Sequence, residues 1–226
     1  NYNAHVNRDR FIGGYGYEKT TSSNIELKAS VLGRYTTKVN PYGTSNNYKG
    51  YKEENGMGVS LLASALKTKS LNDSWDLQTE LSLMHLKDNN NLAEWESDPS
   101  SLTLVVPMRY DLAFDADQTF ASTSLILTNN ENLRFEAQIG VNHRNRLTEG
   151  IVFIEDSLSV LQPEDYNVDK NHTTFLPRIG FSYMPTESVS LFGQFSTGFS
   201  DPTAFELVDN ETLLPAELDS EKSVGQ

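Results

Sequence analysis

Aromatic and cationic residues able to hold a small ligand gather in the segments between the regularly patterned parts of the chain. They are Tyr42, Tyr48, Tyr51, Trp95, Arg109, Tyr110 and Tyr166. Aromatic faces attract cations, and a guanidinium donates charge-assisted hydrogen bonds to negatively charged oxygens. This set is the pool of candidate residues for holding a substrate. For any single member, the alternative is an ordinary loop or interfacial aromatic residue.

Residues for catalysis or for a transition-metal site show no recognisable pattern. The histidines are His5, His85, His143 and His172, which are far apart and lack the spacing of a ligand set. The chain contains no cysteine and no Gly-x-Ser-x-Gly segment, so neither a thiol nor a nucleophile elbow is available. We therefore expect no enzymatic activity and no cofactor.

Two acidic stretches offer carboxylates with few neighbouring bases. The first contains Glu149, Glu155, Asp156, Glu164, Asp165 and Asp169, and the second contains Asp201, Glu206, Asp209, Glu211, Glu217 and Asp219. Clustered carboxylate oxygens suit a hard divalent cation such as Ca²⁺. The ordinary explanation is a solvated, repulsive surface. The sequence leaves the question of a metal open.

The elements that must position these residues are β-strands. Over Asn24–Tyr35, Trp75–Leu83 and Leu133–Val141, apolar and polar residues alternate almost one by one. Such alternation gives each strand one apolar and one polar face. The same pattern occupies Phe175–Phe199, where Pro177 predicts a strand end or an irregularity because it cannot donate to a ladder.

Strand length and the rhythm of the connections distinguish a soluble sandwich from a membrane barrel. Sandwich strands are commonly about five or six residues long, whereas tilted membrane strands need about nine to eleven. Several runs here reach the longer figure. The predicted short turns are near Glu18–Ser23, Lys69–Ser74, Thr128–Asn132 and Pro185–Ser188; the predicted long connections are Thr36–Glu54, Lys87–Asp117, Ile151–Asn171 and Asp201–Leu218. Strict alternation of short and long is typical of outer-membrane barrels.

One segment inside the Lys87–Asp117 connection has some strand character. A spanning strand at Ser101–Phe114 would invert the up-down order of every later strand. Pro107 and nearby acidic residues interrupt its alternation, so we expect an excursion within the loop.

Composition limits the function classes further. The hydrophobic share is 37%, and no stretch approaches the roughly 18 uncharged apolar residues of a membrane-spanning helix. The net charge of −13 disfavours a nucleic-acid partner, because phosphate binding needs clustered Lys and Arg. The first residues lack the apolar core of a signal peptide, and the chain has no stop-like tail, which predicts an internal piece of a longer protein.

The stretch PRIGFSYMPTESVSLFGQFSTGFSDPTAFEL resembles the late barrel region of TonB-dependent outer-membrane receptors. The matching positions are Pro177, Arg178, Gly180, Tyr183, Pro185, Thr186, Ser190, Leu191, Gly198, Phe199, Pro202, Thr203, Glu206 and Leu207. Downstream, LDSEKSVGQ is similar to a further family segment through Leu218, Glu221, Lys222 and Ser223. Upstream, FASTSLILTNNENLRFEAQIGVNH is a looser match, in which Thr123 replaces the usual Asp. The first half of the chain fits by alternation and loop rhythm alone.

The resemblance implies an antiparallel transmembrane β-barrel of roughly 22 strands with a plugged lumen. This chain would supply about nine of those strands as part of a single barrel domain covering residues 1–226. The plug, the energy-coupling segment before it and the last strands would lie outside the chain. The resemblance also implies the outer membrane of a Gram-negative bacterium, contact with its lipid, and a partner in the TonB energy-coupling complex through the missing N-terminal part.

As cargo, the resemblance implies a scarce nutrient, most often a ferric siderophore. Receptors of this kind tend to hold the iron chelate with Tyr, Trp and Arg of the outer loops. Tyr17, Trp75 and Tyr183 would belong to an interfacial aromatic girdle beside the short turns. Two alternatives stay open, a soluble secreted β-sandwich with a binding or adhesion role and a small complete outer-membrane channel of about eight to ten strands.

Overall fold

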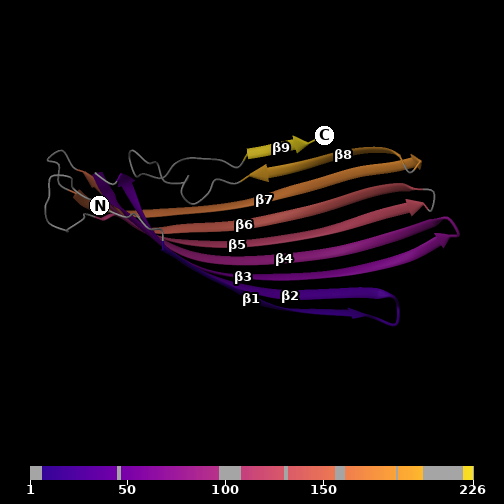
Figure 1. Ribbon diagram of the computed structural model, residues 1–226, viewed down its shortest axis with the longest axis horizontal. Coiled ribbons are helices and arrows are strands. Elements are labelled where there is room, and N and C mark those ends of the chain that lie inside the picture. Colours follow the sequence, from indigo (N-terminus) through magenta and orange to yellow (C-terminus); the bar gives the residue numbers. More distant parts are fainter. Residues whose placement is uncertain are drawn as a thin grey trace.

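The computed structural model describes residues 7–44, 47–96, 108–129, 132–155, 161–186, 188–200 and 221–225. The strands are β1 (Asn7–Thr20), β2 (Ile25–Thr44), β3 (Asn47–Asn72), β4 (Trp75–Glu96), β5 (Met108–Asn129), β6 (Leu133–Glu155), β7 (Leu161–Thr186), β8 (Val189–Ser200) and β9 (Glu221–Gly225). They form one nine-stranded sheet in which each strand pairs antiparallel with the next (Figure 1). This confirms the predicted all-β, antiparallel fold. No helix that could cross a membrane occurs among the described residues.

Short turns join β1 to β2, β3 to β4, β5 to β6 and β7 to β8, all at the same end of the sheet, as predicted (Figure 1). Asn24 and Asn132 take left-handed backbone conformations, with φ of 56° and 70°. Asparagine adopts this region more readily than most residues. In the β3–β4 turn, the Asn72 side-chain oxygen accepts hydrogen bonds from the backbone N–H groups of Ser74 and Trp75, at 2.9 and 3.1 Å. Polar turn residues thus stabilise these hairpins locally.

The predicted long connections are wrong in their extent, because the strands continue far into them. β2 and β3 occupy nearly all of Thr36–Glu54, and β6 and β7 occupy most of Ile151–Asn171. Strands β3 to β7 are 22 to 26 residues long, about twice the length that a membrane requires. Asn, Asp and Gly made these segments resemble loops, but pairing with neighbouring strands outweighs their weak strand propensity. The predicted connection Asp201–Leu218 lies outside the described residues.

The two expectations that rested on proline have different outcomes. The loop excursion predicted at Ser101–Phe114 is wrong in its described part, since Met108–Phe114 begins β5. This part extends an existing strand, so the up-down order is not inverted. Residues 101–107 lie outside the described part. No strand ends at Pro177, since β7 runs through it from Leu161 to Thr186. The alternative prediction, an irregularity, is confirmed for one ladder, because the β7–β8 pairing stops at the neighbouring Arg178.

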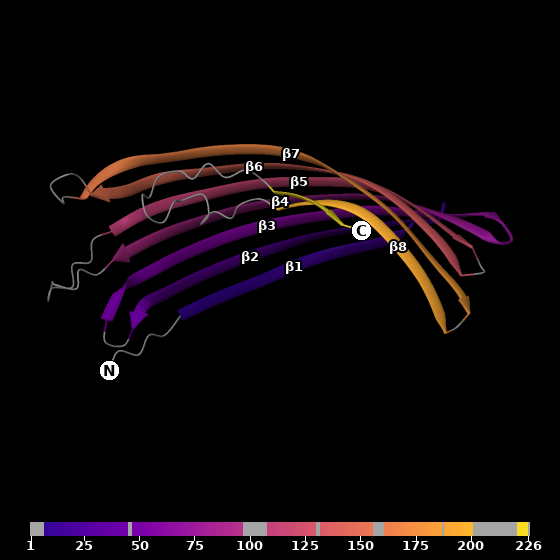
Figure 2. The same ribbon diagram turned by 90° about the horizontal axis from the view of Figure 1, so that it is seen from above.

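The sheet is curved (Figure 2), and its two faces differ in burial. We call the face that carries Ser122, Gln138 and Asn142 the inner face, and the face that carries Ile139 and Phe195 the outer face. Every buried residue of the described part lies on the inner face, including the apolar cluster of Leu92, Tyr110, Leu112, Phe114, Val152 and Tyr166. Side chains crowd together on the concave side of a curved sheet, so the inner face is the concave one.

Candidate functional site

The outer face carries a continuous apolar belt on the half of the sheet next to the short turns. On β6 and β7 the belt consists of Leu133, Phe135, Ala137, Ile139, Val141, Phe175, Pro177, Ile179, Phe181 and Tyr183. Phe175 and Ile179 are 59% and 63% exposed, and no described strand covers them. Nine residues at about 3.3 Å each, tilted by about 40°, span about 23 Å. That height agrees with the apolar band of an outer-membrane barrel, which is about 25 Å tall.

A row of polar side chains marks one edge of the belt on β4 to β7. His85, Thr119, His143 and Thr173 are successive cross-strand partners. His85 Nδ1 lies 3.0 Å from Thr119 Oγ1, and His143 Nδ1 lies 2.9 Å from Thr173 Oγ1. These two histidines therefore pair with threonines at the edge of the belt, which gives them a structural role.

Beyond this row the polarity of the outer face changes. Asp115, Asn145 and Asp169 replace the apolar residues there. On the turn side of the row, the next outer-face positions on β5 and β6 hold Ala121 and Val141. A strand that leaves hydrocarbon for water shows this change, because only the segment inside the bilayer needs apolar side chains facing outward.

The aromatic residues predicted to form a girdle lie on the outer face. Trp75 begins β4, and Tyr183 lies near the end of β7, beside the short turns. Tyr17 pairs with Ala29 near the turn end of β1. Amphipathic rings at the border of the belt suit the interface between hydrocarbon and water.

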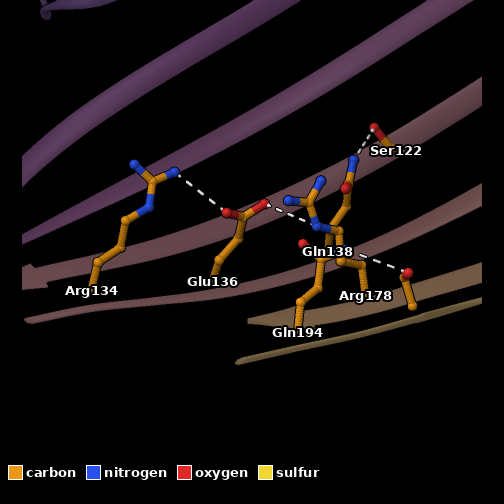
Figure 3. A network of polar contacts seen from close by, with 7 residues as sticks. Ser122, Arg134, Glu136, Gln138, Arg178 and Gln194 are labelled. Carbon is orange, nitrogen blue, oxygen red and sulfur yellow. Dashed lines mark hydrogen bonds and ion pairs between the residues drawn. The ribbon is translucent and has the colours of Figure 1, made fainter. Parts of the chain in front are cut away.

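The inner face opposite the belt is polar (Figure 3). Glu136 Oε2 lies 3.3 Å from Arg134 Nη2, and Glu136 Oε1 lies 3.7 Å from Arg178 Nε. Gln138 Nε2 donates a hydrogen bond of 3.3 Å to Ser122 Oγ. Charged groups are costly in hydrocarbon, so this face suits contact with water or with protein.

Further from the turns, the inner face holds a buried carboxylate with several partners. Glu94 on β4 is 3% exposed. Lys52 Nζ lies 2.7 Å from Glu94 Oε2, and Arg109 Nη1 lies 3.6 Å from Glu94 Oε1. The Tyr110 hydroxyl donates a hydrogen bond to Glu94 Oε2. A buried charge needs such partners because its desolvation is costly, and Glu94 thereby ties β3, β4 and β5 together.

A β-bulge sets the position of Arg109. Glu94 pairs with Tyr110, whereas Trp95 pairs with Met108, so Arg109 is the extra residue of the bulge. Bulges commonly redirect a side chain. This one brings the Arg109 guanidinium to the buried carboxylate.

A glycine allows an ion pair to form across an intervening strand. Gly58 on β3 lies between Arg34 on β2 and Asp88 on β4. Arg34 Nη2 lies 2.8 Å from Asp88 Oδ2. A Cβ atom on Gly58 would lie 2.0 Å from Asp88 Oδ1 and 2.8 Å from Arg34 Nε, so a larger residue would displace the pair. The charge of Asp88 is thus balanced from the β2 side.

The predicted ligand-contacting residues are only partly brought together. Arg109 and Tyr110 meet at Glu94, and Tyr110 and Tyr166 belong to the same buried cluster, at 6% and 2% exposure. Burial raises the pKa of Tyr166, which keeps its phenol protonated at neutral pH. Trp95 lies beside the bulge on β4. The remaining members lie outside the part whose side chains are described: Tyr42, Tyr48 and Tyr51.

Sequence reasoning missed Lys52 and Glu94. These residues are far apart along the chain, and only the register of β3 against β4 places them opposite each other. No local pattern signalled this contact, because residues 52–55 and 88–91 are polar throughout.

The positions that carry the family resemblance cluster around the last hairpin. Within β7 and β8 they include Pro177, Arg178, Gly180, Gly198 and Phe199. Glu221 begins β9 and pairs with Ser200 through the backbone. Pro202 and Glu206 lie outside the described residues.

The described carboxylates do not form a cation site. Nowhere in the described ranges do three His, Cys, Asp or Glu side chains converge. In the first acidic stretch, Asp165 and Asp169 lie on the outer face and Glu164 lies on the inner face. Most of these groups therefore form a solvated surface, while Asp156 and the second acidic stretch lie outside the described part.

A family model described as "TonB dependent receptor-like, beta-barrel" matches residues 1–225. The chain belongs to this family of TonB-dependent receptor β-barrels. None of the curated proteins matches the chain in sequence.

Two solved structures have a similar fold. The first is the ferric citrate transporter FecA in the unliganded form, with a TM-score of 0.67 and 11% identity over 86% of this chain and 28% of that chain. The second is the ferric yersiniabactin uptake receptor FyuA from Yersinia pestis, with a TM-score of 0.59 and 13% identity over 97% of this chain and 32% of that chain. This chain thus spans about a third of their length or less. At such identities the likeness concerns the fold alone.

Proposed function

We propose that this chain is part of an active-transport receptor in the outer membrane of a Gram-negative bacterium. The receptor binds a scarce nutrient, a ferric siderophore or a similar iron chelate, and imports it with energy from the TonB complex. The observation that carries this proposal is the apolar belt on the outer face, which ends at the row from His85 to Thr173 while the strands continue beyond it.

The two faces suit the two environments of such a receptor. The belt would contact lipid, and the polar inner face with Glu136 and Gln138 would line a water-filled or plugged lumen. The extended strands would raise Arg109 and Trp95 above the membrane, where a ligand arrives from outside. Both neighbouring structures are named for ferric chelates, which favours an iron chelate as the cargo.

The proposed mechanism is binding followed by release inward, without covalent chemistry. Arg109 and Trp95, together with Tyr42, Tyr48 and Tyr51, are the proposed ligand contacts. Tyr110 and Tyr166 belong to the same set, and because both are buried we propose that they support that surface. A soluble sandwich would need a second sheet over the belt, whereas the described strands form a single sheet.

Expression of the intact receptor in a Gram-negative strain that lacks its own iron receptors tests this proposal. We expect the protein in the outer-membrane fraction, with faster electrophoretic migration before boiling than after it. We also expect growth on at least one ferric chelate under iron limitation, only when TonB is present. A matched strain without TonB is the control. Recovery of the intact protein as a soluble periplasmic monomer would refute the proposal.

A further inference from the structure

Three lysines gather on the outer face where β1 and β3 approach the short turns (Figure 1). They are Lys19 on β1 and Lys67 and Lys69 on β3, and all three are exposed. A single cross-strand row leads from Lys19 through Ala65 to Ile139, which places Lys19 on the outer face. Lys67 and Lys69 occupy the next alternate positions after Ala65, so they share that face. We call these residues the lysine cluster.

The lysine cluster borders the apolar belt on its turn side. On β3 the outer-face positions of the belt are Met57, Val59, Leu61, Ala63 and Ala65. On β6 the apolar run begins at Leu133, which is nearer the turns, because Ala65 lies in the row of Ile139. The belt thus crosses the strands obliquely, as expected when barrel strands tilt by about 40°. Lys67 and Lys69 therefore lie where hydrocarbon meets water.

Few carboxylates stand near the lysine cluster. Glu18 and Glu26 are close in sequence but lie on the inner face, where they are 3.3 and 4.0 Å from Lys28 Nζ. The described outer-face positions on the turn half of β1 to β4 hold no Asp or Glu. Asp73, in the β3–β4 turn, is a single acid close in sequence to three bases. The cluster therefore carries a net positive charge in a chain of net charge −13.

An apolar groove of about 440 Å³ opens beside the lysine cluster on the outer face. Its floor is formed by Ala29 and Ala63, which are cross-strand partners. Larger side chains form its walls, among them Tyr15, Tyr17, Leu61 and Leu83. Ala65 continues the line of small residues from Ala63 toward Lys67. Because the groove lies within the belt, its occupant in a bilayer is hydrocarbon.

We propose that the groove and the lysine cluster form one binding site for an anionic phospholipid of the periplasmic leaflet. One acyl chain lies in the groove, and the phosphate lies between Lys19 and Lys67. The inference goes beyond the proposed transport function and rests on the membrane location in it, since short barrel turns lie on the periplasmic side.

The spacing of the lysines suits a single headgroup. Lys19 and Lys67 stand on either side of β2, two strand spacings of about 4.8 Å apart. Their long side chains can keep the ammonium groups in the headgroup layer while their stems lie on apolar surface. Basic residues near a membrane surface attract anionic lipids. A charge match and a chain groove side by side favour a bound lipid over general contact with the bilayer.

Native mass spectrometry of the intact receptor in detergent micelles tests this inference. The receptor is titrated with phosphatidylglycerol, which is anionic, and with zwitterionic phosphatidylethanolamine, both carrying palmitoyl and oleoyl chains. We expect one phosphatidylglycerol to be retained with at least about 10-fold higher affinity, as the charges of the lysines require. Glycerol 3-phosphate, which has the charge but no chains, should not bind in the same range. This result separates a lipid site from a site for free phosphate.

Charge variants test the lysine cluster. The double variant Lys67→Gln with Lys69→Gln should lose affinity for phosphatidylglycerol by about 10- to 30-fold, at about fivefold for each lysine. Its affinity for phosphatidylethanolamine should change by less than about twofold, because that lipid carries no net charge. Lys87→Gln is the matched control: Lys87 is exposed on the outer face of β4, beyond the row that contains His85, and this variant should bind as the wild type does.

A second pair of variants tests the groove. Ala63→Phe fills its floor, so the affinity for both lipids should fall while the preference for phosphatidylglycerol remains. Ala137→Phe is the control, since Ala137 is exposed on the outer face of β6 and does not line the groove. Migration before and after boiling confirms that each variant is folded. The lysine variant changes only exposed side chains and decides the matter if Ala63→Phe does not fold.

Equal retention of the two lipids by the wild-type receptor would overturn the inference, because the lysines would then be ordinary interfacial residues. Unchanged affinity for phosphatidylglycerol in the folded lysine variant would overturn it as well. Either result leaves the transport function standing if the receptor is found in the outer membrane and supports growth on a ferric chelate. Recovery of the intact protein as a soluble periplasmic monomer would refute the proposed function and the inference together.

Discussion

Arginine in place of Ile179 is expected to destabilise the folded protein in a bilayer by about 2–4 kcal/mol, the cost of such a residue near the midplane of a barrel wall. Ile179 lies at the centre of the belt on β7 and is 63% exposed on the outer face. In lipid, the new guanidinium must either enter hydrocarbon or bend toward the interface. The free energy of unfolding is measured by urea titration of the intact receptor in lipid vesicles.

Asn171→Arg is the matched control for this substitution. Asn171 lies on the same strand and the same face, but beyond the belt, where it pairs with Asn145. We expect a change within about 0.5 kcal/mol, as for other surface substitutions. Equal costs at the two positions, or no cost at Ile179, would contradict the assignment of the belt to lipid.

Alanine in place of Gly150 is expected to destabilise the protein by about 3 kcal/mol or more, through backbone strain and overpacking. Gly150 has φ of 154°, a conformation that favours glycine. A Cβ atom there would lie 2.1 Å from the carbonyl oxygen of Asp111 and 2.9 Å from the Cα atom of Leu112. Both are backbone atoms, so only a separation of β5 from β6 can relieve the contact. Urea titration measures the effect.

The Gly150→Ala substitution should also disturb the end of the sheet where we propose that the ligand binds. Leu112 and Val152 belong to the buried cluster next to Tyr110, which helps to hold Arg109 through Glu94. Gly180→Ala is the control, because its Cβ atom would meet only the carbonyl oxygen of Gly193, at an ordinary 3.6 Å. We expect that variant to change stability by less than about 1 kcal/mol. Comparable losses in the two variants would contradict the packing described around Gly150.

The strands themselves were predictable because alternation is a local signal. The run Leu133–Val141 alone shows which residues share a face, and its partner β7 repeats the pattern. Turns such as the one before Leu133 were also predictable, since Asn132 can adopt the left-handed backbone that the turn needs. These features depend on neighbours in sequence.

The extent of the strands depended on contacts that the sequence does not display. Asp88 to Asn91 read as a loop by composition, yet they pair with both β3 and β5. Asn90 is accommodated because its side chain lies over Gly56, where a Cβ atom would come within 2.1 Å of Asn90 Oδ1. The complementarity between these residues appears only once the register is known.

The candidate site shows the same limit. Arg109 and Tyr110 were predicted from residue type, but the carboxylate that joins them to Lys52 was not, because Glu94 is brought to them by cross-strand pairing.

The central claim is that the outer face contacts lipid, and spin labels test it most directly. The chain contains no cysteine, so single cysteines at Leu81, Ile139 and Phe195 can be labelled selectively within it. In the intact receptor in a bilayer, we expect these labels to be accessible to oxygen dissolved in the acyl chains and shielded from a water-soluble nickel complex. Labels at Gln138 and Gln194, on the inner face, should not show this preference for oxygen. If all three outer-face labels are out of reach of the acyl chains, the belt does not face lipid and the receptor assignment is contradicted.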